Sequence, residues 1–135
     1  MSLKRLKNFL NYKLYLDKIH RSSDDLYALQ TIHKFFPENS YLPFTPFSLN
    51  PYTIVHILND ILFNDRKQII EFGTGISTII ISRFIQVNKL STQILSIDHN
   101  KEWQNKITAE LLKYGTQTNA QMVHAELIEH NNVIY

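Results

Sequence analysis

The sequence predicts an α/β fold in which a short parallel sheet follows a helical N-terminal segment. Apolar residues recur at helical spacing through much of the first 65 residues. From residue 66 onward, short apolar runs typical of strands alternate with segments of helical pattern. Strands that alternate with helices of about 10–15 residues pair in parallel through right-handed crossovers. We therefore expect one structural unit, built from a helical segment, residues 1–65, and a sheet-containing segment, residues 66–135.

The helical segment begins with two predicted helices. Leucines recur at roughly helical spacing over residues 3–20, which predicts the first helix. Residues 22–25 read Ser-Ser-Asp-Asp, and these residue types are favoured as N-caps, so we expect a second helix to begin there. This helix should end near residue 36, because Pro37 cannot continue the hydrogen-bond pattern.

A loop and a third helix complete the helical segment. Prolines and aromatic residues recur through residues 37–50, which favours a loop. Asn50 is a good N-cap, and Pro51 suits the first position of a helix. The third helix should therefore begin at Pro51, and its apolar pattern ends near residues 64–65.

The sheet-containing segment alternates strand and helix from its start. We expect strands at residues 67–72, 93–98 and about 120–125, and helices at residues 76–88 and 101–114. Gly115 follows the second of these helices and is a plausible helix terminator, because glycine adopts the left-handed conformation freely.

The composition is typical of a globular protein, with 44% hydrophobic and 19% charged residues. The chain has no cysteine, so disulfides, thiol catalysis and cysteine-ligated zinc are excluded, and no metal site is predicted. Its apolar stretches are far shorter than the roughly 18 residues that a membrane span requires. The first 20 residues also lack the apolar core of a secretory signal. We therefore expect a cytoplasmic protein without a transmembrane segment.

Basic residues gather at the N-terminus, although the net charge of the chain is only +2. Residues 1–21 contain a single acid, Asp17, and the basic residues Lys4, Arg5, Lys7, Lys13, Lys18 and Arg21. One interpretation is the solvated face of a surface helix. The other is a patch for RNA, for an anionic lipid surface or for an acidic partner.

The residues from Glu71 to Thr78 read Glu-Phe-Gly-Thr-Gly-Ile-Ser-Thr and join the first predicted strand to the next helix. Gly73 and Gly75 permit backbone angles and a close approach that side chains would forbid. The start of the helix presents free N–H groups and a partial positive charge, to which the hydroxyls of Ser77 and its neighbour add donors. The pattern predicts a loop that holds an anionic part of a ligand. The alternative is a tight turn without a ligand.

A second acid, Asp98, ends the neighbouring strand, roughly 20 residues after the glycine loop. A carboxylate in this position accepts hydrogen bonds from the hydroxyls of a ribose. The alternative is that Asp98 caps the helix that follows, because Asp is a favoured N-cap.

The glycine loop resembles motif I of the class I S-adenosylmethionine-dependent methyltransferases. Glu71 lies two residues before the first glycine, as in that family, and Thr78 stands where a dinucleotide-binding loop has its third glycine. The resemblance implies that the backbone of Gly73, Thr74 and Gly75 holds the methionine part of S-adenosylmethionine.

The residues after the second strand are similar to the second motif of the same family. The resemblance implies that Asp98 binds the ribose and that His99 lies near the adenine, with Trp103 as the downstream aromatic residue. A weaker match at the end of the third strand places Ala125 and Glu126 beside the adenine edge, although His124 stands where many members carry an acid.

The resemblance also implies a fold, namely a three-layer Rossmann-like half-domain with sheet order 3-2-1. The family's core has further strands beyond these three, so the chain is similar to an apparently truncated N-terminal half. Strand 67–72 would then be an apolar edge. We expect it to be covered by a second copy of the chain in a homodimer, by the N-terminal helices or by a missing C-terminal half.

Two functions follow from these patterns. The first is the S-adenosylmethionine-binding portion of a methyltransferase, which would act on an unidentified methyl acceptor if further residues or a partner complete it. The alternative is a non-catalytic ligand-binding or interaction module whose basic N-terminal helix binds a partner. No catalytic residue is assigned, because lone histidines are more often structural or solvated.

Overall fold

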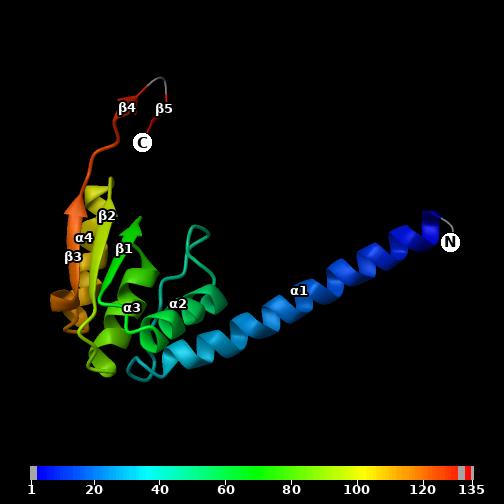
Figure 1. The fold of residues 1–135 in the computed structure, drawn as a ribbon, viewed down its shortest axis with the longest axis horizontal. Helices are drawn as coiled ribbons and strands as arrows, with labels where there is room; N and C mark the ends of the chain where they lie inside the picture. The colour runs from blue at the N-terminus through cyan, green and yellow to red at the C-terminus, as the bar shows by residue number, and fades with distance from the viewer. Residues whose placement is uncertain (1–2, 131–132, 135) are drawn as a thin grey trace.

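The computed structural model describes residues 3–130 and 133–134, and its elements are drawn in Figure 1. For residues 3–6, 9, 129–130 and 133–134 it describes the backbone alone. The elements are α1 (Leu3–His33), α2 (Pro51–Phe63), β1 (Gln68–Phe72), α3 (Ile76–Val87), β2 (Gln93–Asp98), α4 (Lys101–Lys113), the 3-10 turn η1 (Gln117–Asn119), β3 (Ala120–His124), β4 (Glu129–His130) and β5 (Val133–Ile134).

The main sheet contains three parallel strands in the order β1-β2-β3. Ile69 of β1 lies opposite Ile94 of β2, which in turn lies opposite Ala120 of β3. The α/β class, the parallel pairing and the strand order are therefore confirmed. Gly115 has a φ of +66°, as expected of the residue that ends α4.

The predicted boundary between the first two helices is wrong, because α1 runs without a break from Leu3 to His33. Serine and aspartate favour caps but cost only a fraction of a kcal/mol inside a helix, roughly up to 0.7 relative to alanine. Asp25 still acts as a capping residue, but for another helix. Its Oδ1 accepts a hydrogen bond from Tyr52 N, 3.1 Å away in the first turn of α2.

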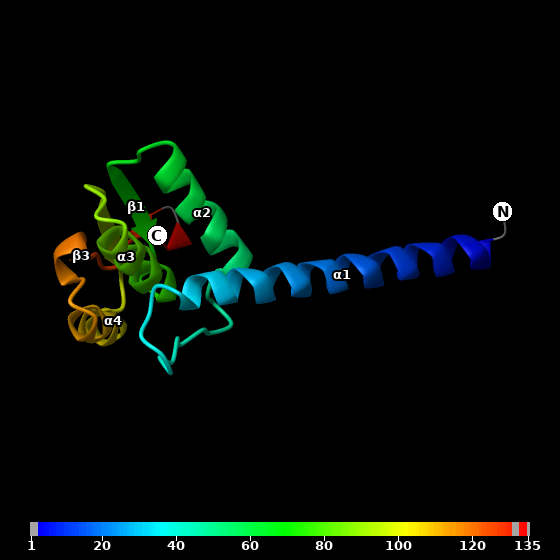
Figure 2. The same cartoon turned by 90° about the horizontal axis from the view of Figure 1, so that it is seen from below.

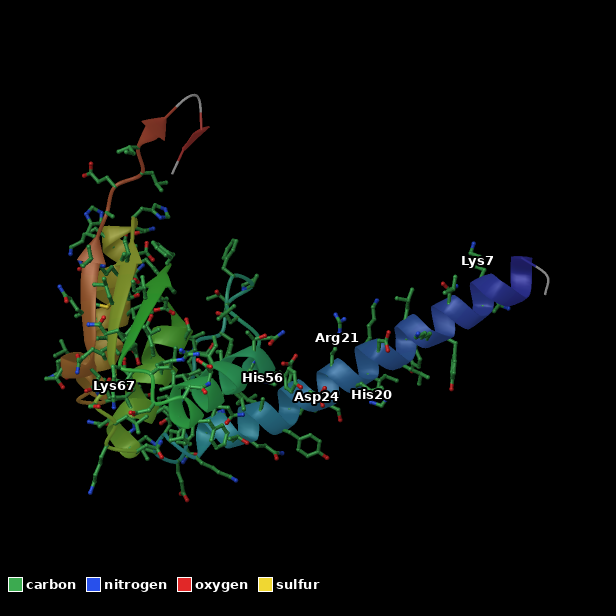
Figure 3. The ribbon with its side chains drawn as sticks, in the orientation of Figure 1. Lys7, His20, Arg21, Asp24, His56 and Lys67 are labelled. Carbon is green, nitrogen blue, oxygen red and sulfur yellow. The ribbon has the colours of Figure 1, made fainter. Side chains whose placement is uncertain are left out.

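Most of α1 projects away from the body of the molecule, as Figures 1 and 2 show. Only its C-terminal end packs closely, through the buried side chains of Ala28 and Ile32. Farther toward the N-terminus, Tyr12 and Leu14 are each 60% exposed. The side chains of Lys7 and Arg21 point into solvent along this free part of the helix (Figure 3). Among the described residues, no helix combines the length and the apolar character needed to cross a bilayer.

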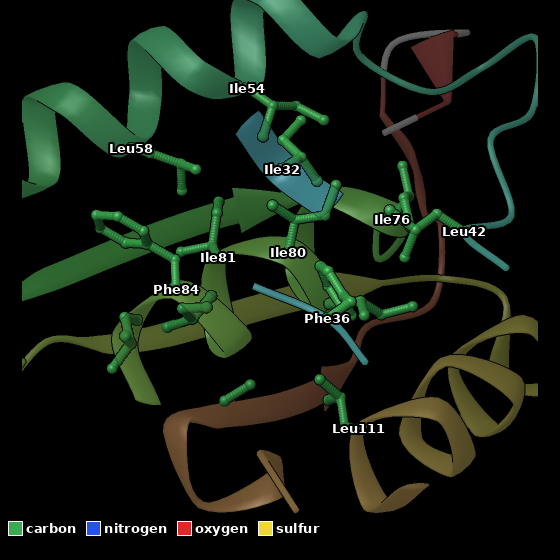
Figure 4. Close-up of a cluster of buried hydrophobic side chains, with 14 of the residues drawn as sticks. Ile32, Phe36, Leu42, Ile54, Leu58, Ile76, Ile80, Ile81, Phe84 and Leu111 are labelled. Carbon is green, nitrogen blue, oxygen red and sulfur yellow. The ribbon is translucent and has the colours of Figure 1, made fainter. Parts of the chain in front are cut away.

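The core lies between the helices and one face of the sheet (Figure 4). α3 is central to it, and its buried apolar residues include Ile79, Ile80 and Ile85. α2 contributes Ile54 and Leu58, which point toward α3 in Figure 4, and the remaining fully buried residues include Ile32, Ile94 and Leu111. This packing fixes α3, and with it the turn between β1 and α3.

The opposite face of the sheet is apolar and open in the described part of the chain. Ile70 and Phe72 of β1 are 61% and 82% exposed, and they lie beside Leu95 and Ile97 of β2. The described residues therefore supply the sheet and one helical layer of the three layers expected. Within them, β1 pairs with β2 on one side and with no strand on the other.

Candidate functional site

A cleft of about 760 Å³ lies at the carboxyl ends of β1 and β2. Its walls are residues 45–49 of the loop before α2, residues 71–77 of the turn between β1 and α3, residues 98–100 and Trp103. Clefts at the carboxyl ends of parallel strands are the usual ligand sites of open α/β sheets. The sequence-predicted residues Glu71, Gly73, Thr74, Gly75, Ser77, Asp98 and His99 all line it.

Glu71 holds the floor of the cleft together. Its carboxylate accepts hydrogen bonds from the hydroxyls of Ser77 and Thr78 in the first turn of α3. It also accepts one from Ser96 Oγ, 2.9 Å away on β2 and directly opposite in the register of the two strands. A single half-buried carboxylate thus connects β1, β2 and α3.

These contacts change what the two hydroxyls can do for a ligand. Thr78 is fully buried and is not among the residues that line the cleft. Its Oγ1 also accepts a hydrogen bond from Gly75 N at 3.0 Å. The Ser77 hydroxyl donates to Glu71 rather than into the cleft. Both hydroxyls therefore stabilise the loop through Glu71, Ser77 from the lining of the cleft and Thr78 from behind it.

The two glycines of the loop serve different purposes. Gly73 has a φ of +91°, a conformation that side chains rarely adopt, and its N–H donates to Ile97 O at 2.8 Å. Gly75 has an extended backbone with a φ of −169°, which any residue can adopt. A Cβ at Gly75 would meet nothing within 4 Å. Because Gly75 lines the cleft, its missing side chain leaves room for a ligand rather than for the protein itself.

Asp98 ties the glycine loop to the start of α4. It is only 7% exposed, and its Oδ2 accepts from Thr74 N while its Oδ1 accepts from Asn100 N, both at 2.7 Å. The residue that caps α4 is Asn100, whose side chain accepts from Trp103 N at 2.9 Å. The alternative that Asp98 caps this helix is therefore wrong. An ionised carboxylate has about four acceptor sites, so Asp98 keeps capacity for a ligand.

Trp103 supports the loop from the opposite side. Its indole Nε1 donates to Thr74 O at 2.6 Å, and its ring lines the cleft. Thr74 is therefore held at both backbone polar atoms, by Asp98 and by Trp103.

His99 is the histidine that the structure places in the cleft. Its side chain is 58% exposed, and its Nδ1 lies 3.7 Å from Asp98 Oδ1. The ring of His124, at the end of β3, contacts the backbone of His99, with Nε2 2.9 Å from His99 O.

Ala125 and Glu126 are exposed and do not line the cleft. The backbone N–H of Ala125 donates to Asp98 O at 2.9 Å, which continues the pairing of β2 with β3 beyond the end of β3. Because β2 separates β3 from β1, the end of β3 and these two residues lie outside the walls of the cleft.

The loop of residues 45–49 is the part of the site that the sequence did not reveal. Ser48 Oγ accepts from Thr45 N at 2.9 Å, and Ser48 N donates to Thr45 O at 3.0 Å, so this loop is a closed turn. Phe47 stands at its tip, 98% exposed. The aromatic residues between prolines were the available signal, but only tertiary packing places this loop opposite the glycine turn.

The lining of the cleft is richer in acidic than in cationic side chains. Its lining includes two carboxylates, Glu71 and Asp98, and none of its lining residues is lysine or arginine. The first turn of α3 offers a local positive end, suited to one anionic group. The site therefore favours a ligand that combines one small anion with positive charge, and it disfavours several phosphates.

Compared with models of known protein families and with curated proteins, the chain gives no match.

The two glycines offer a matched pair of substitutions. Gly73→Ser should lower the free energy of unfolding by about 1–3 kcal/mol, because serine is strained at positive φ. Gly75→Ser should change it by less than about 0.5 kcal/mol, because serine caps a helix at least as well as glycine. Urea-induced unfolding followed by circular dichroism measures both values. Equal destabilisation by the two substitutions would contradict the conformations assigned here.

Proposed function

We propose that the chain binds S-adenosylmethionine in this cleft and forms the cofactor-binding portion of a class I methyltransferase. The single observation that carries the proposal is the joint position of the glycine turn, the start of α3 and Asp98 around one cleft whose lining contains no lysine or arginine. The resemblance in sequence agrees with this arrangement.

The cleft offers one partner for each polar part of the cofactor. The methionine carboxylate would lie at the N-terminus of α3, against backbone that Gly75 leaves uncovered. The ribose hydroxyls would donate to Asp98, which keeps free acceptor sites. His99 and Trp103 both line the cleft and would lie beside the adenine.

Charge favours this cofactor over a dinucleotide. S-adenosylmethionine carries a sulfonium, an ammonium and a carboxylate, so its net charge is positive. A dinucleotide carries a pyrophosphate, which would lie beside two carboxylates without a lysine or arginine in the lining. The buried Thr78 also replaces the third glycine that a dinucleotide loop prefers.

The reaction would be transfer of the sulfonium methyl group to a nucleophile. Such a transfer depends mainly on holding the acceptor in line with the methyl–sulfur bond. The residues described here would hold and orient the cofactor, and further residues or a partner would complete the acceptor side.

Binding of the cofactor is measurable by titration calorimetry. The wild-type chain should bind both S-adenosylmethionine and S-adenosylhomocysteine with a Kd below about 1 mM. Gly75→Val and Asp98→Asn should each raise this Kd at least about tenfold, which corresponds to 1.4 kcal/mol. NAD should bind far more weakly. Asp24→Asn, on the free part of α1, is the matched control and should change nothing. Absence of binding at millimolar cofactor would refute the proposal.

The free part of α1 favours a second candidate function, an interaction module for an anionic partner. Its exposed cations include Lys13, Lys18 and Arg21, and this part of the helix packs against nothing else in the described chain (Figure 3). An isolated helix is only marginally stable in water, so a partner would stabilise it. We take single-stranded RNA as the test partner, because its phosphates would match these cations.

RNA binding is separable from cofactor binding by substitution. Replacing Lys13, Lys18 and Arg21 together by glutamine should weaken binding to a single-stranded RNA at least about tenfold. It should also reduce the slope of the logarithm of the binding constant against the logarithm of the salt concentration by roughly 2. The matched control replaces Lys101, Lys106 and Lys113 of α4. Fluorescence anisotropy across a salt series measures both. Equal losses for the two triple variants, or no RNA binding at low salt, would count against this function.

A further inference from the structure

Two phenyl rings stand almost free of protein contact at the mouth of the cleft. Phe47 is 98% exposed and Phe72 is 82% exposed, and both line the cleft. They come from elements far apart in the sequence, the loop before α2 and the last residue of β1. Exposed apolar surface that gathers in a cleft typically marks a place where an apolar group binds.

The positions of both rings are fixed by the backbone. The turn closed by Thr45 and Ser48 carries Phe47 at its tip. Phe72 follows Glu71 on a strand, and successive side chains of a strand point to opposite faces. Because Glu71 is bound on the helical side of the sheet, Phe72 must point to the open side.

The cleft therefore has two chemically distinct parts. Its floor is polar and consists of the glycine turn, the start of α3 and Asp98. Its mouth is apolar and includes Leu49 beside the two phenyl rings. If the polar floor holds the cofactor, the mouth is the part of the cleft left for a second molecule.

We propose that Phe47, Leu49 and Phe72 form a subsite for the methyl acceptor, a small uncharged molecule with a flat apolar body, of the class of aromatic alcohols. The inference rests on the proposed function, since an acceptor presupposes the cofactor. With two carboxylates and no lysine or arginine in its lining, the cleft disfavours phosphorylated acceptors. The apolar body lies between the rings, where its burial removes exposed apolar surface from water.

The reaction of such an acceptor balances without a further reactant. A lone pair of the acceptor oxygen forms the new carbon–oxygen bond while the carbon–sulfur bond breaks. The electron pair of that bond stays on sulfur, which becomes the neutral thioether of S-adenosylhomocysteine. The hydroxyl proton of the acceptor is released to water.

The test uses 2-naphthol as the probe, with the full chain in the presence and absence of saturating S-adenosylhomocysteine. Its fluorescence reports binding, and Phe47→Ser and Phe72→Ser should each raise the Kd at least about tenfold. Two matched controls are exposed apolar residues outside the cleft. Phe63, at the end of α2, is 78% exposed, and Ile70 lies on the same sheet face as Phe72. Phe63→Ser and Ile70→Ser should leave the Kd unchanged within about twofold.

Each outcome decides the proposal. Absence of 2-naphthol binding up to its solubility limit would overturn it. An equal loss of 2-naphthol affinity in the cleft variants and in Ile70→Ser would also overturn it, because adsorption to the open sheet face would then explain the signal. Binding of 2-naphthyl phosphate as tight as that of 2-naphthol would overturn the charge selection. Failure of the proposed function is distinguishable. S-adenosylhomocysteine would then not bind, while 2-naphthol binding would still depend on the two phenyl rings.

Discussion

The position of the whole cleft depends on the carboxylate of Glu71. Parallel pairing places Glu71 opposite Ser96, and the chain then turns so that Ser77 and Thr78 also reach the same carboxylate. Three hydroxyl donors from two other elements therefore converge on one acid at the end of β1. A half-buried carboxylate needs such donors, and the buried hydroxyls of Ser77 and Thr78 need an acceptor. The two requirements are met by one geometry, in which the first turn of α3 lies against the end of the sheet.

The N-terminal segment contributes to the same site by a series of caps. Asp25 of α1 caps the start of α2 from outside, and Asn50 caps it from within the chain through Thr53 N at 2.8 Å. The start of α2 is thereby fixed, and so is the loop of residues 45–49 that ends there. This loop is the wall of the cleft opposite the glycine turn. The helical and sheet-containing segments thus build one cleft between them, although their sequence patterns differ.

The sequence predicted those parts of the fold that depend on local pattern. The alternation of strand and helix, the cap at Asn50 and the terminator at Gly115 follow from a few neighbouring residues, and all are present. Residues 22–25 misled because a capping side chain can serve a distant helix as well as its own, as Asp25 does. Likewise, a pattern in sequence marks Thr78 as part of the glycine motif but cannot tell that its hydroxyl faces Glu71. The role of Phe47 depends on tertiary packing alone, and no local signal could have placed it at the mouth of the cleft.

We propose that the turn from Gly73 to Ser77, held by Glu71 and Asp98, is a binding site for S-adenosylmethionine. The most direct measurement is a two-dimensional ¹H–¹⁵N NMR titration of the full chain with this cofactor. We predict that the amide signals of Thr74, Gly75 and Ser77 and those of residues 98–100 shift together, while Gly115, at the far end of α4, stays unchanged. The absence of shifts at millimolar cofactor, or shifts confined to α1, would show that this turn is not the binding site.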